Sequence, residues 1–384
     1  MNQSNSTRPT PAISSHFDSG AIEVVSINNT LATSDIAVNI RKDSHADFRQ
    51  WFHFRVSGAR GLACAIRFQN AGACTYPEGW RNYNAVASYD RKRWFRVPTA
   101  YEGAVMTINH TPECDAVWYA YFEPYSLERH QRLIGRAGAS KHARTERLGA
   151  SVDGRDIDLI TIGEGGEAKK PIWLIARQHP GEAMAEWFIE GLIERLLDNA
   201  DPIAQRLLER AVFYIVPNMN PDGSVRGNLR TNAAGANLNR EWMTPSMEAS
   251  PEVFLVRSRI QQTGANAFFD IHGDEALPYN FVAGGEMLPG FTPEQVATQN
   301  NFIENFKRAS PDFQDTHGYS AGKYQEDSLK LASKWVGHTF GCLSLTLEMP
   351  FKDNADLPQP SVGWNGDRSA KLGAAMLEPI LASL

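Results

Sequence analysis

Three residues of this 384-residue chain have the types and positions that could bind a metal ion. His179 and Glu182 flank a Pro-Gly corner between an apolar run and a helical pattern, and His272 ends a later apolar run. Zinc hydrolases use such His2Glu sets and leave one position open for water. Each residue alone has an ordinary explanation, because a strand-end histidine often only hydrogen-bonds and the helix dipole favours a glutamate in a first helical turn. The combination favours a metal site.

A loop rich in asparagine and arginine follows another apolar run. It begins with Asn220-Pro221-Asp222-Gly223 and continues through Arg226, Arg230, Asn239 and Arg240. Arginine presents a planar fork that binds carboxylates through two hydrogen bonds. One loop arginine is normally just solvated, but this acidic chain gathers several here. The loop therefore favours a carboxylate-binding role.

Glu348 is the fourth polar group at a predicted strand end in this half of the chain. Alternation over residues 343–348 places Ser344, Thr346 and Glu348 on one face of a strand. Taken alone, Glu348 could be a carboxylate on a solvated strand face. Beside a metal site it could instead be the general base of a metallohydrolase.

The elements that must position these residues alternate between strands and helices. Continuous apolar runs predict strands buried on both faces. Apolar residues that recur about every four positions predict helices between them. This alternation predicts an α/β domain with a mixed, mostly parallel sheet covered by helices. Strands are expected at 171–176, 212–216, 267–271 and 343–349, helices at 127–134, 182–199, 251–263, 295–307, 329–335 and 370–384, and a hairpin at 148–162.

The first half of the chain shows a different pattern. Short alternating segments follow one another at intervals of about ten residues, which is typical of antiparallel sandwiches. We expect a flexible N-terminus over 1–20, an antiparallel β-sandwich domain over 21–125, and the chemistry in a domain over 126–384.

The composition restricts the possible partners and location. Lys+Arg 38 and Asp+Glu 44 give a net charge of −6, whereas a nucleic-acid surface must be basic. No apolar run reaches the roughly 18 residues of a membrane span. The four cysteines fit neither a zinc pattern nor a disulfide framework, so we expect reduced thiols in the cytoplasm and no nucleic-acid or membrane partner.

Taken in order, these motifs resemble the signature of zinc metallocarboxypeptidases, most of all the cytosolic carboxypeptidase subfamily, which has a β-sandwich domain before the catalytic one. The resemblance implies a hydrolase with one zinc ion per chain that removes residues from the C-termini of peptides or protein tails. The motifs are His179 to Glu182, Asn220 to Gly223, Arg230, Asn239-Arg240, His272-Gly273 and Leu347-Glu348.

The resemblance also implies roles for individual residues. His179, Glu182 and His272 would bind zinc, which lowers the pKa of a bound water toward ~7. Glu348 would be the general base, and Arg230 would stabilise the oxyanion. Asn239 and Arg240 would bind the terminal carboxylate of the substrate.

Several positions depart from the family pattern or leave a choice. Asn237 stands where members often have an aspartate that orients the first zinc histidine. Tyr324 is the candidate active-site tyrosine, with Tyr319 behind it. Lys330, with Lys334 as second choice, would place a positive charge in the pocket for the released side chain and so favour glutamate.

The sequence is also compatible with three other functions. A zinc amidohydrolase that deacylates N-acyl amino acids would use the same residues, but those proteins place a β domain after the core. A peptidase for γ-glutamyl or cell-wall peptides is a variant of the main hypothesis. A non-catalytic binding module would not require Glu348.

Overall fold

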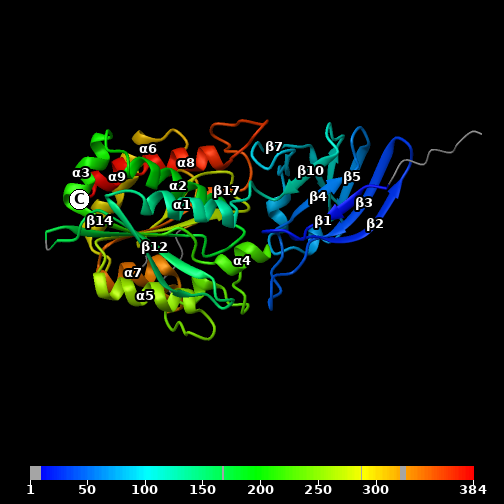
Figure 1. Cartoon of the computed structure of the whole chain (residues 1–384). Coiled ribbons are helices and arrows are strands. Elements are labelled where there is room, and N and C mark those ends of the chain that lie inside the picture. The colour runs from blue at the N-terminus through cyan, green and yellow to red at the C-terminus, as the bar shows by residue number, and fades with distance from the viewer. Residues whose placement is uncertain (1–9, 167, 287, 321–325) are drawn as a thin grey trace, which may run out of the picture.

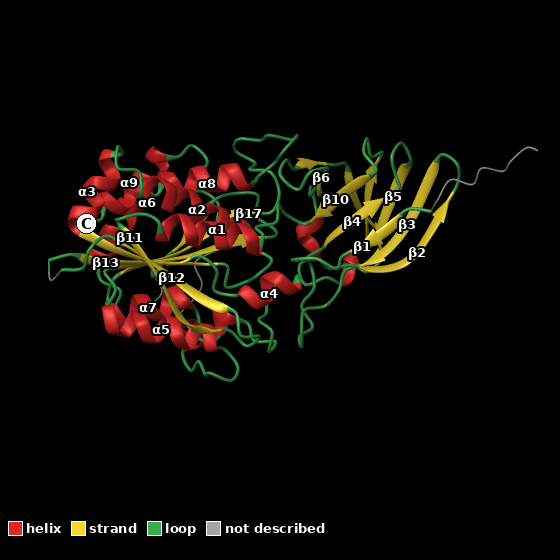
Figure 2. Cartoon of the chain, viewed as in Figure 1, coloured by secondary structure: helices red, strands yellow, loops and turns green. Residues whose placement is uncertain are grey.

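The computed structural model describes residues 10–166, 168–286, 288–320 and 326–384. Within these residues a β-rich domain lies beside an α/β domain, with the short helix α4 (Pro221–Arg226) on the side facing the β-rich domain (Figure 1). The first comprises strands β1 to β10, and the second is a mixed sheet with helices on both faces (Figure 2). The fold class predicted from the sequence is confirmed.

The β-rich domain consists of two five-stranded sheets packed face to face. Phe54 on one sheet lies 6.2 Å from Phe68 on the other, measured between ring centroids. The strand order in the first sheet is β1 (Ala12–Ser14), β4 (His53–Ser57), β10 (Ala116–Ala120), β6 (Val86–Ser88), β7 (Phe95–Arg96). The order in the second sheet is β2 (Glu23–Asn29), β3 (Thr33–Asn39), β5 (Ala63–Phe68), β9 (Val105–His110), β8 (Thr99–Glu102).

Two details of this domain differ from the prediction. Ala12–Ser14 lies in the segment expected to be flexible, yet it forms β1 and pairs with β4. Three residues are too few to show a strand period in the sequence. In addition, β3 pairs with β5 in parallel, although an antiparallel sandwich was expected.

The sheet of the α/β domain has a parallel centre. β13 pairs in parallel with β14 and β15, and β15 pairs in parallel with β17. Carboxyl ends of parallel strands meet at one edge of a sheet, where α/β proteins place ligand sites. The order is β11 (Ala143–Ala150), β12 (Asp156–Ile162), β14 (Ala211–Val216), β13 (Lys170–Ala176), β15 (Ala267–Asp274), β17 (Leu343–Pro350), β16 (Phe281–Ala283).

Helices cover both faces of this sheet. Those labelled α5 and α7 lie on one face, and α2, α6 and α8 lie on the other (Figure 2). α2 and α8 approach so closely that a Cβ on Gly191 would meet the Ala370 carbonyl oxygen at 2.0 Å. Besides α4, the helices are α1 (Leu127–Gly138), α2 (Met184–Leu196), α3 (Pro202–Arg210), α5 (Pro251–Thr263), α6 (Pro293–Ala309), α7 (Ala332–Phe340), α8 (Gly366–Ala375) and α9 (Leu377–Ala382).

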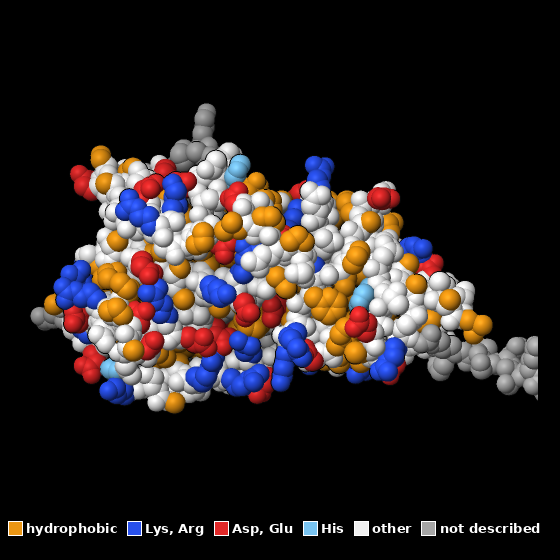
Figure 3. Space-filling view, turned by 90° about the horizontal axis from the view of Figure 1, so that it is seen from above, with side chains coloured by type: hydrophobic (Ala, Val, Ile, Leu, Met, Phe, Trp, Pro, Cys, Tyr) orange, Lys and Arg blue, Asp and Glu red, His pale blue; other side chains and the backbone are white. Residues whose placement is uncertain are grey.

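The surface over the helices mixes charges of both signs. In Figure 3 acidic and basic side chains alternate over the face seen from above. Of the helices in the described part of the chain, none has both the length and the apolar character that a bilayer span requires.

Candidate active site

The turn after β13 carries two of the three candidate metal ligands. Arg177, its first residue, has a φ of 59°, in the left-handed region that non-glycine residues seldom adopt. Its guanidinium donates to the Pro180 carbonyl at 3.0 Å and to the Glu186 carboxylate at 2.7 Å. These bonds hold the backbone that presents His179 and Glu182.

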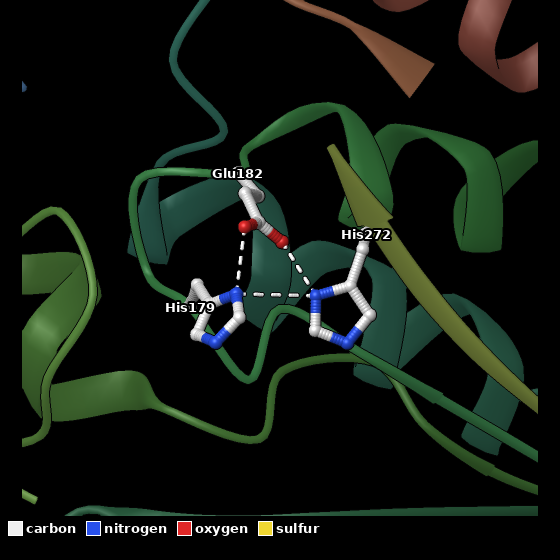
Figure 4. Close-up of side chains that lie close together, drawn as sticks. All are labelled: His179, Glu182 and His272. Atoms are coloured by element: carbon white, nitrogen blue, oxygen red, sulfur yellow. Dashed lines mark hydrogen bonds and ion pairs between the residues drawn. The ribbon is translucent and has the colours of Figure 1, made fainter. Parts of the chain in front are cut away.

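His179, Glu182 and His272 converge on one point, as their spacing predicted (Figure 4). The Glu182 carboxylate lies 2.7 Å from Nδ1 of each histidine, and the two Nδ1 atoms are 3.2 Å apart. All three side chains are buried. Such an N/O donor set suits zinc, which takes histidine nitrogen and carboxylate oxygen at ~2.0–2.2 Å.

The remaining ring nitrogen of each histidine has a hydrogen-bond partner. Nε2 of His179 lies 3.1 Å from Oδ1 of Asn237, and Nε2 of His272 lies 2.9 Å from Oδ2 of Asp270. The Gln178 amide donates to the same Asp270 oxygen at 2.7 Å. Partners of this kind fix the orientation of metal-binding histidines. The hydrogen bonds to both rings therefore fit a zinc site.

At His179 and Glu182, burial and electrostatics favour the protonation states that a metal requires. Burial, assisted by the positive charge of Arg230, lowers the pKa of His179 to about 3 and keeps the ring neutral. Burial would raise the pKa of Glu182, but the two adjacent imidazoles outweigh it and lower the pKa. At His272 burial would lower the pKa, but the carboxylates of Asp270 and Glu182 outweigh it and raise the pKa well above its ordinary value. Neutral imidazole and anionic carboxylate are the forms that bind cations.

Glu348 lies on β17 next to this cluster. Its side chain is buried, and Oε2 has no hydrogen-bond partner within the described residues. Burial, with the negative charges of Glu182 and Asp274, raises the pKa of Glu348 well above its ordinary value. A carboxylate with a raised pKa is a stronger base, which suits proton transfer.

These groups share a cleft of about 620 Å³. Arg230, the predicted oxyanion residue, lines it together with the metal cluster and Glu348. Asn239 and Arg240, the loop residues predicted to bind the terminal carboxylate, line it as well. Asn239 is held in place because its Oδ1 accepts the Ala332 backbone N–H at 2.9 Å.

The lysine and tyrosine predictions have different outcomes. Lys330 pairs with Asp327 at 2.9 Å and is not among the described residues that line the cleft, whereas Lys334 is. Tyr324 lies outside the described residues. Tyr319, the second choice, lines the cleft and donates to Oδ2 of Asp274 at 2.7 Å.

Arg226 is not part of the cleft lining either. Its guanidinium binds the Asp153 carboxylate at 2.8 and 2.7 Å. The positive charge expected from the loop is therefore concentrated in Arg230 and Arg240.

Residues of the β-rich domain also reach the cleft, and sequence reasoning missed them. Tyr76 and Glu78 contribute to the cleft lining. The Asp43 carboxylate accepts backbone N–H groups of the Arg230 loop. No local pattern marks these residues, because their partners lie far away in the sequence.

A buried His2Glu cluster lies beside Glu348, a carboxylate with a raised pKa, where the parallel strands of the sheet end. This arrangement defines a metallohydrolase. Family comparison makes the class more specific. Residues 136–362 match the zinc carboxypeptidase model, and residues 13–122 match the N-terminal domain of cytosolic carboxypeptidases. The chain belongs to the zinc carboxypeptidase family.

Solved structures support the same assignment. A metallo-carboxypeptidase from Burkholderia cenocepacia is 60% identical, with a TM-score of 0.95 over 97% of this chain and 99% of that one. A metallo-carboxypeptidase from Pseudomonas aeruginosa, in complex with (2-guanidinoethylmercapto)succinic acid, is 46% identical, with a TM-score of 0.92 over 96% and 98%. Mouse cytosolic carboxypeptidase 6 is 29% identical, and the match covers 81% of this chain and 62% of the mouse protein. The chain is a metallocarboxypeptidase.

Proposed function

We propose that this enzyme uses one zinc ion per chain to release single C-terminal residues, with a preference for glutamate, from peptides or protein tails in the cytoplasm. One observation carries the proposal: the His179–Glu182–His272 cluster and Glu348 share a cleft with Arg230, Asn239 and Arg240. Relatives named cytosolic carboxypeptidases support the location.

Each of the cleft residues has its own role in the proposed peptide hydrolysis. Zinc held by the three ligands would supply Lewis acidity and bring the pKa of a water toward ~7. Glu348 takes a proton from the attacking water and passes it to the leaving amine. Arg230 donates hydrogen bonds to the carbonyl oxygen as negative charge develops there. Asn239 and Arg240 bind the terminal carboxylate, which restricts cleavage to chain ends.

Lys334 supports the preference for an acidic released residue. It lines the cleft, and its burial lowers its pKa while the nearby Glu286 opposes this effect. A partly desolvated ammonium group attracts a carboxylate more strongly than a solvated one.

Glu348→Gln tests the central assignment. This variant should bind one equivalent of zinc, measured by metal analysis, and lose turnover by about 100-fold or more, since it keeps the shape of the side chain but cannot accept a proton. Retained turnover would refute the role of Glu348. Loss of zinc would show that Glu348 acts on the metal site instead.

A further inference from the structure

One carboxylate of the β-rich domain holds the backbone of the loop that carries Arg230. Oδ1 of Asp43 accepts the Leu229 N–H at 2.6 Å, and Oδ2 accepts the N–H groups of Arg230 at 2.7 Å and Thr231 at 2.9 Å. The Thr231 hydroxyl adds a fourth bond to Oδ2 at 3.1 Å. Three consecutive N–H groups thus point at one anion, an arrangement that fixes a loop conformation.

Asp43 is itself held rigidly. Its N–H donates to the Phe48 carbonyl at 2.8 Å, which closes the segment between β3 and β4. The adjacent Ser44 N–H donates to Oδ1 of Asn228 at 3.2 Å, so a second contact ties this segment to the Arg230 loop. Asp43 is 6% exposed, and water therefore competes little for its oxygens.

The side chain of Arg230 also rests on the β-rich domain. Its guanidinium carbon lies 5.8 Å from the ring centre of Phe48 and 5.6 Å from that of Tyr76. In the described part of the chain, no hydrogen bond or close ion pair joins this guanidinium to another group. Among the contacts of the described residues, backbone fixation and the two ring contacts therefore determine where its N–H groups point.

We propose that Asp43 is a positioning residue for Arg230, so that the β-rich domain is part of the catalytic machinery rather than an appended module. This inference rests on the proposed role of Arg230 in stabilising the oxyanion. The four bonds to Asp43 hold the loop in the geometry that aims the guanidinium at the scissile carbonyl. Donors of this kind act only when they are aligned in advance with the developing charge.

Asp43→Asn tests the proposal with little change in shape. One oxygen becomes an NH2 group that cannot accept the loop N–H bonds, and kcat should fall about 10- to 100-fold with KM nearly unchanged. Asp35→Asn is the matched control, because Asp35 lies on β3 of the same domain and pairs with Arg67 at the surface. The control should retain full activity. If Asp43→Asn is not recovered folded, Thr231→Val, which removes one bond, replaces it.

A second readout separates positioning from general destabilisation. A phosphonate peptide analogue mimics the tetrahedral oxyanion, whereas free glutamate, the released product, does not. Asp43→Asn should weaken phosphonate inhibition by the same factor as it lowers kcat/KM and leave inhibition by glutamate unchanged. Equal weakening of both inhibitors, or of neither, would overturn the positioning role.

A double-mutant cycle with Arg230→Ala distinguishes this inference from the proposed function. Once Arg230 is absent, Asp43→Asn should lower kcat by less than about twofold further, because coupled residues are not additive. Unchanged kcat in Arg230→Ala alone would refute the oxyanion role of Arg230. Reduced kcat in Arg230→Ala, with an undiminished further loss from Asp43→Asn, would refute only the positioning role.

Discussion

Glu348 lies directly opposite His272 in the parallel ladder between β15 and β17. Opposite residues of neighbouring strands project from the same face of a sheet and lie about 5 Å apart. The proposed base is therefore placed beside the metal cluster by backbone hydrogen bonds rather than by a loop. A register slip of one residue would send Glu348 to the other face, which makes the ladder part of the active site.

Exchange of Lys334 should change the preference for the released residue. We expect Lys334→Ala to lower kcat/KM about 10- to 100-fold for peptides ending in Glu, because a charge-assisted bond is worth roughly 1.5–3 kcal/mol. Peptides ending in Phe should be affected far less. Steady-state assays on matched peptides would measure both.

Lys330→Ala is the matched control for this exchange. Lys330 pairs with Asp327, and its side chain is 42% exposed. Its removal should leave the ratio of Glu to Phe release unchanged. A loss of Glu release in Lys330→Ala but not in Lys334→Ala would contradict the assignment of the specificity pocket.

Asn237 offers a test of the metal centre. Asn237→Asp would keep an oxygen near Nε2 of His179 and add a negative charge, which makes the imidazole more basic. Zinc should bind about 10-fold more tightly in this variant, and Asn237→Ala should bind it more weakly, since partners of metal-bound histidines contribute on this scale. Competition with a chelator would measure zinc affinity. Equal affinity in all three proteins would argue against zinc binding through His179.

His130 predicts a pH-dependent stability. Burial alone would lower its pKa, but the carboxylates of Glu186, at 2.6 Å, and Asp158, at 3.1 Å, raise it to about 9. Because the folded-state pKa exceeds the unfolded value of about 6.5, the stabilisation is complete below pH 6.5 and is lost as the pH rises through 9. His130→Gln should therefore cost about 2–3 kcal/mol more at pH 6 than at pH 9.5.

Urea denaturation of both proteins at the two pH values would measure this difference. Other titrating groups are present in both proteins, so their contributions to the free energy of unfolding cancel in the comparison. A difference that grows with pH would show that His130 is buried in its neutral form.

The sequence was sufficient to predict the residues that stand at strand ends. His272 and Glu348 follow apolar runs, and carboxyl ends of parallel strands meet at one edge, so their proximity follows from the fold class. His179 and Glu182 are brought together by a local corner. Each of these positions depends on short-range patterns that the sequence displays directly.

The choice between Lys330 and Lys334 depended on a helix phase that the sequence does not display. A helix over 329–335 was expected to carry both residues, but the chain forms a 3-10 turn over Glu326–Lys330 and α7 begins only at Ala332. Only Lys334 lies in α7, and it is the lysine that faces the cleft. Asp43 could not be predicted, since its partners lie across the domain boundary and nothing near it in the sequence indicates them.

The central claim is most directly tested by mass spectrometry of one peptide in two forms, with a free C-terminal carboxylate and with a C-terminal amide. The zinc-loaded enzyme should remove a single C-terminal Glu from the free acid. The amide lacks the charge that Arg240 and Asn239 are proposed to bind, so its cleavage should be at least about 100-fold slower. Cleavage of both forms at similar rates, or cleavage at internal bonds, would contradict the account.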